Sequence, residues 1–286
     1  MDIYLSKVIC VSLWCFSGLQ KVVLSIAGSD SGGGAGIQAD LRTFFTRGVF
    51  GVSAITAITA QNTQTVSLVH PLPAHVVAAQ LDALYADFTI AAVKIGMLAN
   101  LAVVRVVSDF VQQISCPVIL DPVLKSTSGA ILLENEAIEY LEQHILPYVT
   151  VFTPNIPEAS IFSGIEITAQ TSLAAVYRRL LQKAPQMAIL LKGGHLPLDY
   201  QGIKVTVDRF WENDAEKVFV NPYICSENLH GTGCTLASVI AAEVAKGVPT
   251  LLAVETAISY VHKAILAATK IGGGNSPIKQ GFFQDE

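Results

Sequence analysis

The sequence is poor in charge, and it has no excess of positive charge. Only 14% of its 286 residues are charged, against about 25% in an average soluble domain. Its 18 lysines and arginines are outnumbered by 23 aspartates and glutamates, which leaves a net charge of −5. A chain without a basic cluster lacks the electrostatic surface that binds phosphate backbones, so we expect no nucleic-acid partner. The 51% of hydrophobic residues also exclude an intrinsically disordered chain.

Cysteine is scarce as well, and its pattern excludes a disulfide framework. The sequence has five cysteines, an odd number, at positions without C-x-x-C spacing. A chain of this size does not need disulfides, so we interpret the cysteines as reduced thiols of a cytoplasmic protein. The six histidines form no H-E-x-x-H motif and no cluster with cysteine. We therefore expect no metal cage built by the protein alone, and we expect any metal to arrive with a substrate.

A long hydrophobic run is missing, although the mean hydropathy is high at +0.50. The longest uncharged stretch, residues 48–81, is interrupted by polar residues 61–65 and by Pro71 and Pro73. No run reaches the roughly 20 apolar residues of a membrane span, so we expect no membrane association. Residues 1–20 contain a short apolar stretch without a small-residue cleavage site. We interpret them as an N-terminal extension, either a tail or an extra strand, or as the result of a misassigned start codon, rather than as a signal peptide.

From residue 21 onward, short runs of β-branched residues alternate with segments of helical periodicity. This is the pattern of βαβ units, so we predict a single α/β domain over residues 21–270, with a central, mainly parallel β-sheet flanked by helices on both faces. Residues 271–286 are predicted to be a polar, mobile C-terminal tail. The predicted strands are residues 22–27, 49–60 in part, 91–95, 117–120, 149–153, 187–192, 202–208 and 217–221, and the predicted helices include 36–47, 74–87, 101–113, 136–146, 173–183, 232–246 and 249–270.

Two glycine-rich segments lie at junctions where α/β proteins bind ligands. Residues 27–36 follow a predicted strand and lead into a helix, where glycines let the backbone approach a bound group. Their spacing matches neither G-x-G-x-x-G nor the Walker sequence. Residues 229–236 open an alanine-rich helix, whose unpaired N–H groups and dipole favour an anion. Cys234 near this helix start is expected to have a lowered pKa and to act as an acid–base group or nucleophile; the alternative is a small buried hydrophobic residue.

Several other segments begin where predicted strands stop, and each carries polar side chains. The carboxyl ends of parallel strands meet at one edge of a sheet, so we expect these segments to converge on one site. Any one of them alone would be an ordinary turn. The segments are residues 60–63, 94–98, 121–123, 153–158 and 191–195.

Together these motifs resemble the hydroxymethylpyrimidine/phosphomethylpyrimidine kinases of thiamine biosynthesis, a family of the ribokinase-like superfamily. The resemblance runs in order from about residue 21 to about residue 268. It implies a ribokinase-like fold and two transfers of the γ-phosphoryl group of ATP, first to 4-amino-5-hydroxymethyl-2-methylpyrimidine and then to its monophosphate. The motifs are AGSDSGGGAGIQADL (27–41), ITAQNT (58–63), KIGML (94–98), TPNIPEA (153–159), KGGH (192–195) and HGTGCT (230–235).

The resemblance implies a catalytic role for the second glycine-rich segment. Gly231, Thr232 and Gly233 would donate hydrogen bonds to the charge that develops on the transferred phosphoryl group. Cys234 occupies the position where most sugar-kinase relatives carry an aspartate base. Because a phosphate monoester already offers an anionic oxygen, we expect Cys234 to assist the first transfer more than the second.

The resemblance also assigns the pyrimidine site. Gln61 would hold the ring, since a carboxamide offers a donor and an acceptor side by side, as an aminopyrimidine does. Asp40 would face the same substrate. Gly28, Met97 and Val123 would form the walls around the ring.

The cofactors implied are ATP and Mg²⁺. Asn155 and Glu158 form the N-x-x-E element that organises Mg²⁺ and the phosphates, with Asp121 as a further carboxylate for the metal. Lys192 would add positive charge near the phosphates, and Thr232 would also contact the nucleotide. Some family members place a phosphate-contacting lysine where this chain has Thr127, and we do not transfer that role to Lys125, two residues earlier.

Two alternatives remain at this point. A pyridoxal kinase shares the fold, the glycine loop and an aromatic hydroxymethyl acceptor, and a non-catalytic pyrimidine sensor could be built on a decayed kinase. Composition and analogy also predict a homodimer.

Overall fold

The computed structural model describes residues 20–124, 132–168, 171–194 and 198–281. The predicted N-terminal extension lies almost wholly outside these residues, as do Lys125 and Thr127. The predictions made for those positions are therefore not tested.

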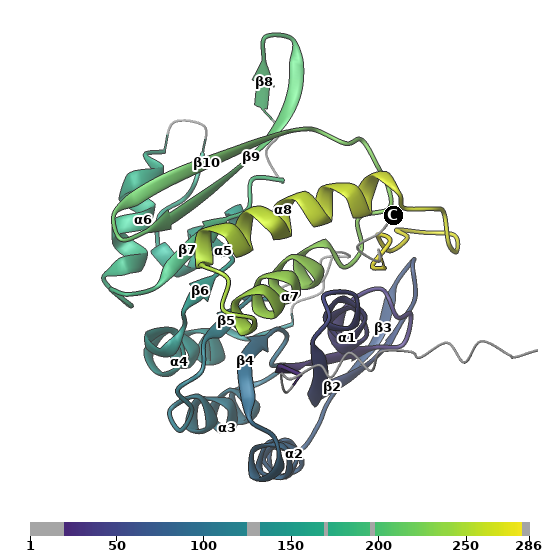
Figure 1. The fold of residues 1–286 in the computed structure, drawn as a ribbon, viewed down its shortest axis with the longest axis vertical. Helices are drawn as coiled ribbons and strands as arrows, with labels where there is room; N and C mark the ends of the chain where they lie inside the picture. The colour runs from purple at the N-terminus through teal and green to yellow at the C-terminus, as the bar shows by residue number, and fades with distance from the viewer. Residues whose placement is uncertain (1–19, 125–131, 169–170, 195–197, 282–286) are drawn as a thin grey trace, which may run out of the picture.

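One sheet organises the described part of the chain (Figure 1). Its strands lie in the order β10-β9-β7-β6-β5-β4-β1-β2-β3, with β8 paired to β9. The six strands from β7 to β2 are parallel. At the two sides, β3 pairs antiparallel with β2, β9 pairs antiparallel with β7, and β8 and β10 pair antiparallel with β9. The strands are β1 (Val22–Asp30), β2 (Phe50–Gln61), β3 (Val66–Pro71), β4 (Ile90–Ile95), β5 (Val118–Leu120), β6 (Val151–Phe152), β7 (Ala188–Leu191), β8 (Leu198–Tyr200), β9 (Ile203–Glu212) and β10 (Ala215–Pro222).

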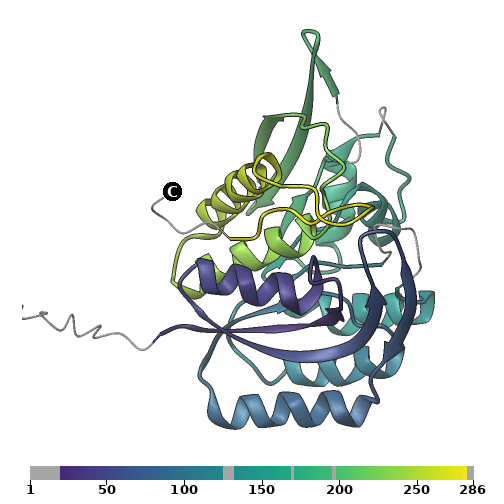
Figure 2. The same cartoon turned by 90° about the vertical axis from the view of Figure 1, so that its right-hand side faces the viewer.

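Helices cover both faces of this sheet, because neighbouring residues of a strand point to opposite sides. Leu24 belongs to the core cluster that includes side chains of helices α2 to α6, whereas Val23 belongs to the cluster that includes side chains of α1, α7 and α8. Figure 2 shows α1 and α2 on opposite sides of β1 and β2. No helix of the described ranges is both long and apolar enough to cross a membrane. The helices are α1 (Gly36–Thr46), α2 (Ala74–Asp87), α3 (Leu101–Val111), α4 (Asn135–His144), α5 (Ile156–Ser163), α6 (Leu173–Leu181), α7 (Thr232–Ala245) and α8 (Thr250–Leu266), with the 3-10 turn η1 (Leu146–Tyr148).

The structure confirms the predicted α/β sheet and adds three elements that the sequence patterns did not indicate. Strand β3 forms a hairpin with β2, closed by Asn62, whose Oδ1 accepts from the N–H groups of Gln64 and Thr65. Strand β8 is short and exposed. Helix α5 begins with a capping box between Asn155 and Glu158. This N-x-x-E spacing is thus a helix-start signal as well as the predicted binding motif.

Part of the predicted C-terminal tail packs against the domain, whereas Ile271 at its start is 57% exposed. The side chains of Ser276, Ile278 and Gln280 are buried. The backbone of His230 donates to Ser276 O and accepts from Ile278 N, at 3.2 Å in both bonds. Burial of an isoleucine and this strand-like pairing hold the segment against the loop that precedes α7.

Candidate active site

A cavity of about 670 Å³ opens at the carboxyl ends of the parallel strands. Residues from the ends of β1, β2 and β4, from the loops after β5, β6 and β7, and from α7 and α8 line it. Every residue predicted for the site lies in its wall except Asp40. The convergence of the polar segments is therefore as expected for a parallel sheet.

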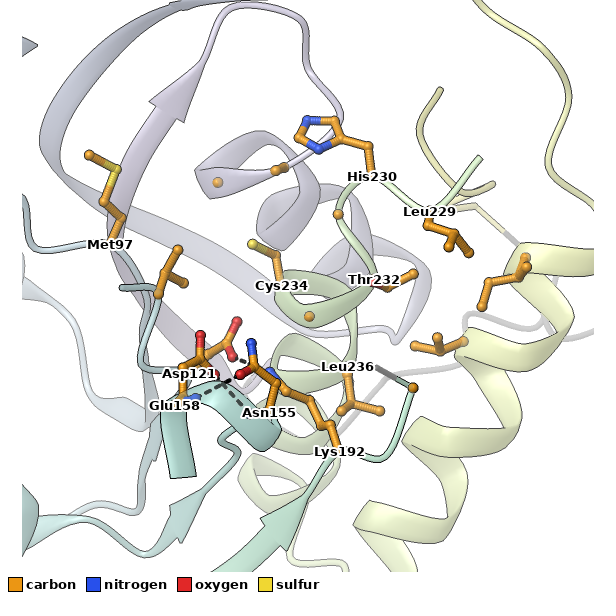
Figure 3. A pocket seen from close by; sticks show the side chains of 18 of the residues that line it. Met97, Asp121, Asn155, Glu158, Lys192, Leu229, His230, Thr232, Cys234 and Leu236 are labelled. Atoms are coloured by element: carbon orange, nitrogen blue, oxygen red, sulfur yellow. Dashed lines mark hydrogen bonds and ion pairs between the residues drawn. The ribbon is translucent and has the colours of Figure 1, made fainter. Parts of the chain in front are cut away.

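The start of α7 forms one wall of this cavity (Figure 3). Gly231 is the N-cap and has a left-handed backbone, with φ of 82°. A Cβ at this position would overlap the carbonyl oxygen of Gly34, so the backbones of the two glycine-rich segments approach closely here. A Cβ on Gly233 would lie 3.2 Å from Oδ2 of Asp121. Glycine here brings the helix start close to a carboxylate and leaves first-turn N–H groups available for an anion.

Cys234 follows this loop, and its side chain points into the cavity (Figure 3). Burial raises the pKa of the thiol to about 11, and the carboxylates of Asp40 and Asp121 act in the same direction. The opposing effects of Lys94 and of the Gly36 backbone are weaker. The prediction of a lowered pKa is therefore wrong: loss of hydration outweighs the helix start, and Cys234 is a neutral thiol at pH 7.

Asp40 does not face the cavity, which corrects the prediction that it contacts the substrate. Its Oδ2 accepts from Lys94 Nζ at 2.8 Å and from Ser25 Oγ at 2.6 Å, and its Oδ1 accepts from Ser238 Oγ at 2.7 Å. The carboxylate is fully buried on the helix face opposite to solvent. Asp40 is thus the counter-ion of a lysine in the cavity wall.

Lys94 is a site residue that sequence reasoning did not assign a role. Burial favours the neutral amine, but Asp40, Cys234 and Asp121 outweigh it and raise the pKa of Lys94. The ammonium is therefore charged, held by Asp40 and close enough to Cys234 to interact with it electrostatically. The signal was present in the KIGML motif, where a lysine ends a strand whose other residues are apolar.

Two carboxylates and a lysine meet on the opposite wall. Lys192 Nζ lies 2.7 Å from Oδ1 of Asp121. Glu158 accepts from the backbone N–H of Asn155 at 2.8 Å, and Asn155 Oδ1 accepts from Glu158 N at 2.9 Å. Burial raises the pKa of Glu158 to about 7, with a further contribution from Asp121 and an opposing one from Lys192. A cation at this wall would relieve the repulsion between the two carboxylates.

The carboxylates fit Mg²⁺, which prefers oxygen ligands and keeps several waters. Within the described ranges, no three His, Cys, Asp or Glu side chains gather as metal ligands. Phosphate oxygens of a nucleotide would have to supply the missing ligands.

The end of the cavity beside Met97, here called the acceptor end, is lined by both apolar and polar side chains. A Cβ on Gly28 would lie 3.1 Å from Met97 Sδ, so glycine lets this side chain pack closely against β1. Val123 and Gln61 complete the walls. A flat ring with one polar edge fits between them.

Asp30 and His230 form a buried pair in the same region, which the sequence patterns did not single out. His230 Nε2 lies 2.8 Å from Asp30 Oδ2. Burial favours the neutral acid, but hydrogen bonds from His230 and from the backbone of Ala35 and Gly32 outweigh it and lower the pKa of Asp30. Asp30 is therefore ionised, and its oxygens can only accept hydrogen bonds.

An apolar pocket continues the cavity beyond the glycine loop, and it too was missed. Its side chains come from α7, α8 and the loop before α7. A flat heterocycle would fit against such side chains. They are Leu229, Leu236, Ile258, Val261 and Ile265.

A parallel sheet with an anion cradle, a lysine–carboxylate cluster and an adjoining apolar pocket defines a small-molecule kinase of the ribokinase-like type. The comparisons agree, since a model of the family "Phosphomethylpyrimidine kinase" matches residues 30–279. The chain belongs to this family, which confirms the resemblance drawn from the motifs.

Relatives and solved structures support the same conclusion. A hydroxymethylpyrimidine/phosphomethylpyrimidine kinase of Rhizobium meliloti is 43% identical, over 91% of this chain and 97% of the relative. The phosphomethylpyrimidine kinase of Clostridium difficile is 37% identical, with a TM-score of 0.73, over 86% of this chain and all of that chain. The pyridoxal kinase of Staphylococcus aureus, solved with AMP-PCP and pyridoxal, is 29% identical with a TM-score of 0.83, over 94% and 96%.

Proposed function

We propose that the chain transfers the γ-phosphoryl group of ATP to the hydroxymethyl group of 4-amino-5-hydroxymethyl-2-methylpyrimidine, and then to the resulting monophosphate, in thiamine diphosphate biosynthesis. The family match and the names of the relatives support this substrate. The observation that carries it is the glycine loop of α7, which lines the same cavity as Met97 and the Lys192 cluster.

The donor side of the site would hold ATP. The apolar pocket of α7 and α8 fits an adenine, and the phosphates would then reach Lys192 and the start of α7. Glu158 and Asp121 would hold Mg²⁺ together with phosphate oxygens. When bound, the ion would neutralise phosphate charge during the transfer.

Transfer needs positioning and charge stabilisation more than covalent chemistry. The N–H groups after Gly231 are fixed by the helix and would meet negative charge on the moving phosphoryl group. Lys192 is held by Asp121 at 2.7 Å, so its charge is oriented before the substrate binds. Thr232 also lines this wall.

The acceptor would lie between Gly28, Met97 and Val123, with its polar edge on Gln61. Its hydroxymethyl group would point to Cys234. A neutral thiol can orient that group without repelling a monophosphate, whereas a carboxylate would repel it. A loose transition state needs little help from a base, so one site can serve both acceptors.

An acceptor panel tests the proposal. Purified protein with Mg-ATP is offered the aminopyrimidine alcohol, its monophosphate, pyridoxal and ribose, and products are identified by mass. We expect turnover of both pyrimidines and formation of the diphosphate. Absence of turnover with either pyrimidine would refute the proposal, and nucleotide binding without turnover of any acceptor would favour a sensor.

Pyridoxal kinase is the second candidate, because the similarity to the Staphylococcus aureus pyridoxal kinase reaches a TM-score of 0.84. Relatives named as pyrimidine kinases are more similar in sequence, at 43–44% identity against 29%. We therefore propose pyridoxal as a side substrate at most. Turnover of pyridoxal in the same panel, without turnover of the pyrimidines, would make pyridoxal kinase the first candidate.

We also propose a cytoplasmic homodimer. The low charge supports self-association, and exposed apolar side chains such as Leu68, 58% exposed on edge strand β3, offer a surface for it. Light scattering of the purified chain measures the assembly directly.

A further inference from the structure

The carboxamide of Gln61 lies between two side chains that restrict its hydrogen bonds. In the structure, Gln61 Nε2 lies 3.2 Å from Nε2 of His230, and Gln61 Oε1 lies 3.2 Å from Oγ1 of Thr59. The hydrogen-bond partners of these two neighbours favour the reverse assignment of the amide oxygen and nitrogen. All three residues line the acceptor end of the cavity. An amide has a donor end and an acceptor end of equal size, so its neighbours decide which end faces which.

On one side, the neighbour is a donor. Asp30 Oδ2 accepts from Gly34 N at 3.0 Å, from Ala35 N at 2.9 Å and from His230 Nε2 at 2.8 Å. A carboxylate so placed offers only lone pairs, so the proton of the imidazole must sit on Nε2. The amide atom beside Nε2–H is therefore favoured to be the oxygen, because an NH₂ group would place two donors against each other.

On the other side, the neighbour is an acceptor. Thr59 Oγ1 donates its single proton to the backbone carbonyl of Ser29, at 3.0 Å. That carbonyl cannot donate in return, so the hydroxyl has only lone pairs left for Gln61. The amide atom beside Thr59 is favoured to be the nitrogen. Both neighbours thus select the same orientation, independently of each other.

We propose that Asp30 and His230, together with Thr59, hold the Gln61 carboxamide with its oxygen toward His230 and its NH₂ toward Thr59, and so decide which way the pyrimidine faces. This inference rests on the proposed function. The free lone pair of the oxygen takes the exocyclic amine of the substrate, and the free N–H takes the ring nitrogen. Asp30, His230 and Thr59 are positioning residues, and Gln61 is the group that touches the ring.

The orientation also places the reacting group. In the substrate, the hydroxymethyl group stands on the carbon next to the one that bears the amine. An amine on the His230 side therefore puts the hydroxymethyl group on that side, where Gly231 and Cys234 follow His230 in the chain. A turned amide would favour the opposite face of the ring and direct the hydroxymethyl group away from the glycine loop.

A pair of ligands with opposite hydrogen-bond patterns tests this. Calorimetry measures the dissociation constants of the aminopyrimidine alcohol and of its 4-oxo analogue, in which a carbonyl and a ring N–H replace the amine and the ring nitrogen. The proteins are wild type, His230→Phe, Thr59→Val and their combination. Thr59→Ser returns the lost hydroxyl, and His70→Phe changes an exposed histidine outside the cavity. Affinity for AMP-PCP checks that each variant is folded.

Wild type is expected to prefer the amino compound by roughly a hundredfold or more, since a fixed polar site rejects a reversed pattern. Loss of either neighbour frees the amide to turn, so the preference is expected to fall by roughly tenfold in each variant and further in the combination. Thr59→Ser is expected to regain the preference for the amino compound, and His70→Phe is expected to keep that preference.

Weaker binding of the amino compound with an unchanged preference would overturn the inference, because His230 and Thr59 would then only shape the site. If His230→Phe does not fold, the comparison of Thr59→Val with Thr59→Ser tests the inference without it. If wild type binds no aminopyrimidine, the proposed function fails and the inference falls with it. If wild type phosphorylates the pyrimidine but no variant changes the preference, only the inference fails.

Discussion

Lys94 Nζ lies 2.8 Å from Asp40 Oδ2, and neither side chain is exposed to solvent. The sequence places the two residues 54 positions apart, on β4 and α1. The pair holds a positive charge in the cavity wall, where it interacts electrostatically with Cys234, so Asp40 acts on the site through Lys94.

Asp40→Asn is therefore expected to destabilise the fold. It leaves a buried ammonium without its counter-ion, which costs about 3–5 kcal/mol. Urea unfolding measures the loss, and adding Lys94→Met should recover most of it. Asp109→Asn, at an exposed position of α3, is the control. A loss no larger than in that control would contradict the account of the pair.

The raised pKa of Glu158 predicts that the free energy of unfolding depends on pH. The pKa rises from an ordinary 4.5 to about 7 in the folded chain, so the folded state binds more protons between those values. Its contribution to the free energy of unfolding is thus lost as pH rises from 4.5 to 7. Glu158→Gln removes the titrating carboxyl group, and with it this loss of stability. The amide oxygen of glutamine can still accept the helix-cap hydrogen bond from Asn155 N.

The test compares urea unfolding of the two proteins without nucleotide or metal. The stability of Glu158→Gln relative to wild type is expected to increase by roughly 1–3 kcal/mol between pH 5 and pH 8. Parallel pH profiles for the two proteins would show that Glu158 titrates normally.

Gly231→Ala is expected to slow both transfers strongly. The backbone of Gly231 is left-handed, and a methyl group would overlap the carbonyl of Gly34, so the loop must shift. A shift of about 1 Å in a catalytic group costs about a hundredfold in rate. Gly247→Ala is the matched control, because its φ is 86° and nothing lies within 4 Å. Equal kcat values for the two variants would mean that kcat responds to backbone strain at any left-handed glycine, and not to the position of the glycine loop.

Cys234→Ala is expected to separate the two transfers. Because the thiol is neutral, the first transfer should fall by roughly tenfold, less than the hundredfold or more of a full general base. The second transfer, which starts from an anionic oxygen, should change less. Separate assays with the alcohol and the monophosphate measure this, with Cys116→Ala as the control. Full activity of Cys234→Ala in the first transfer would remove Cys234 from the mechanism.

Gln61→Leu is expected to raise the KM for the pyrimidine by tens of fold, since the polar edge of the ring loses its partner. Nucleotide affinity should stay unchanged. Gln113→Leu, at an exposed position after α3, serves for comparison. An unchanged KM in Gln61→Leu would place the ring elsewhere.

Periodicity predicted much of this fold, because a parallel sheet buried on both faces leaves strong signals. The strand ends then predicted where the polar segments meet, and twelve of the thirteen predicted site residues line the cavity. Their individual roles remain predictions.

The errors have a common cause, which is that burial depends on residues distant in sequence. Asp40 lies in a motif next to the cavity, but only the packing of α1 against α7 and β4 shows that it points to Ser238 and Lys94. The helix start suggested a reactive Cys234, yet burial dominates its pKa. The polar composition after residue 270 likewise hides the burial of Ile278.

The central claim is that one site performs both transfers on a pyrimidine. The most direct test is a time course in which purified protein receives Mg-ATP and the aminopyrimidine alcohol, with products followed by mass. The account predicts that the monophosphate appears first and is converted to the diphosphate, and that Gly231→Ala slows the formation of both products together. A monophosphate that accumulates without further conversion, or a diphosphate step that keeps its rate in Gly231→Ala, would contradict it.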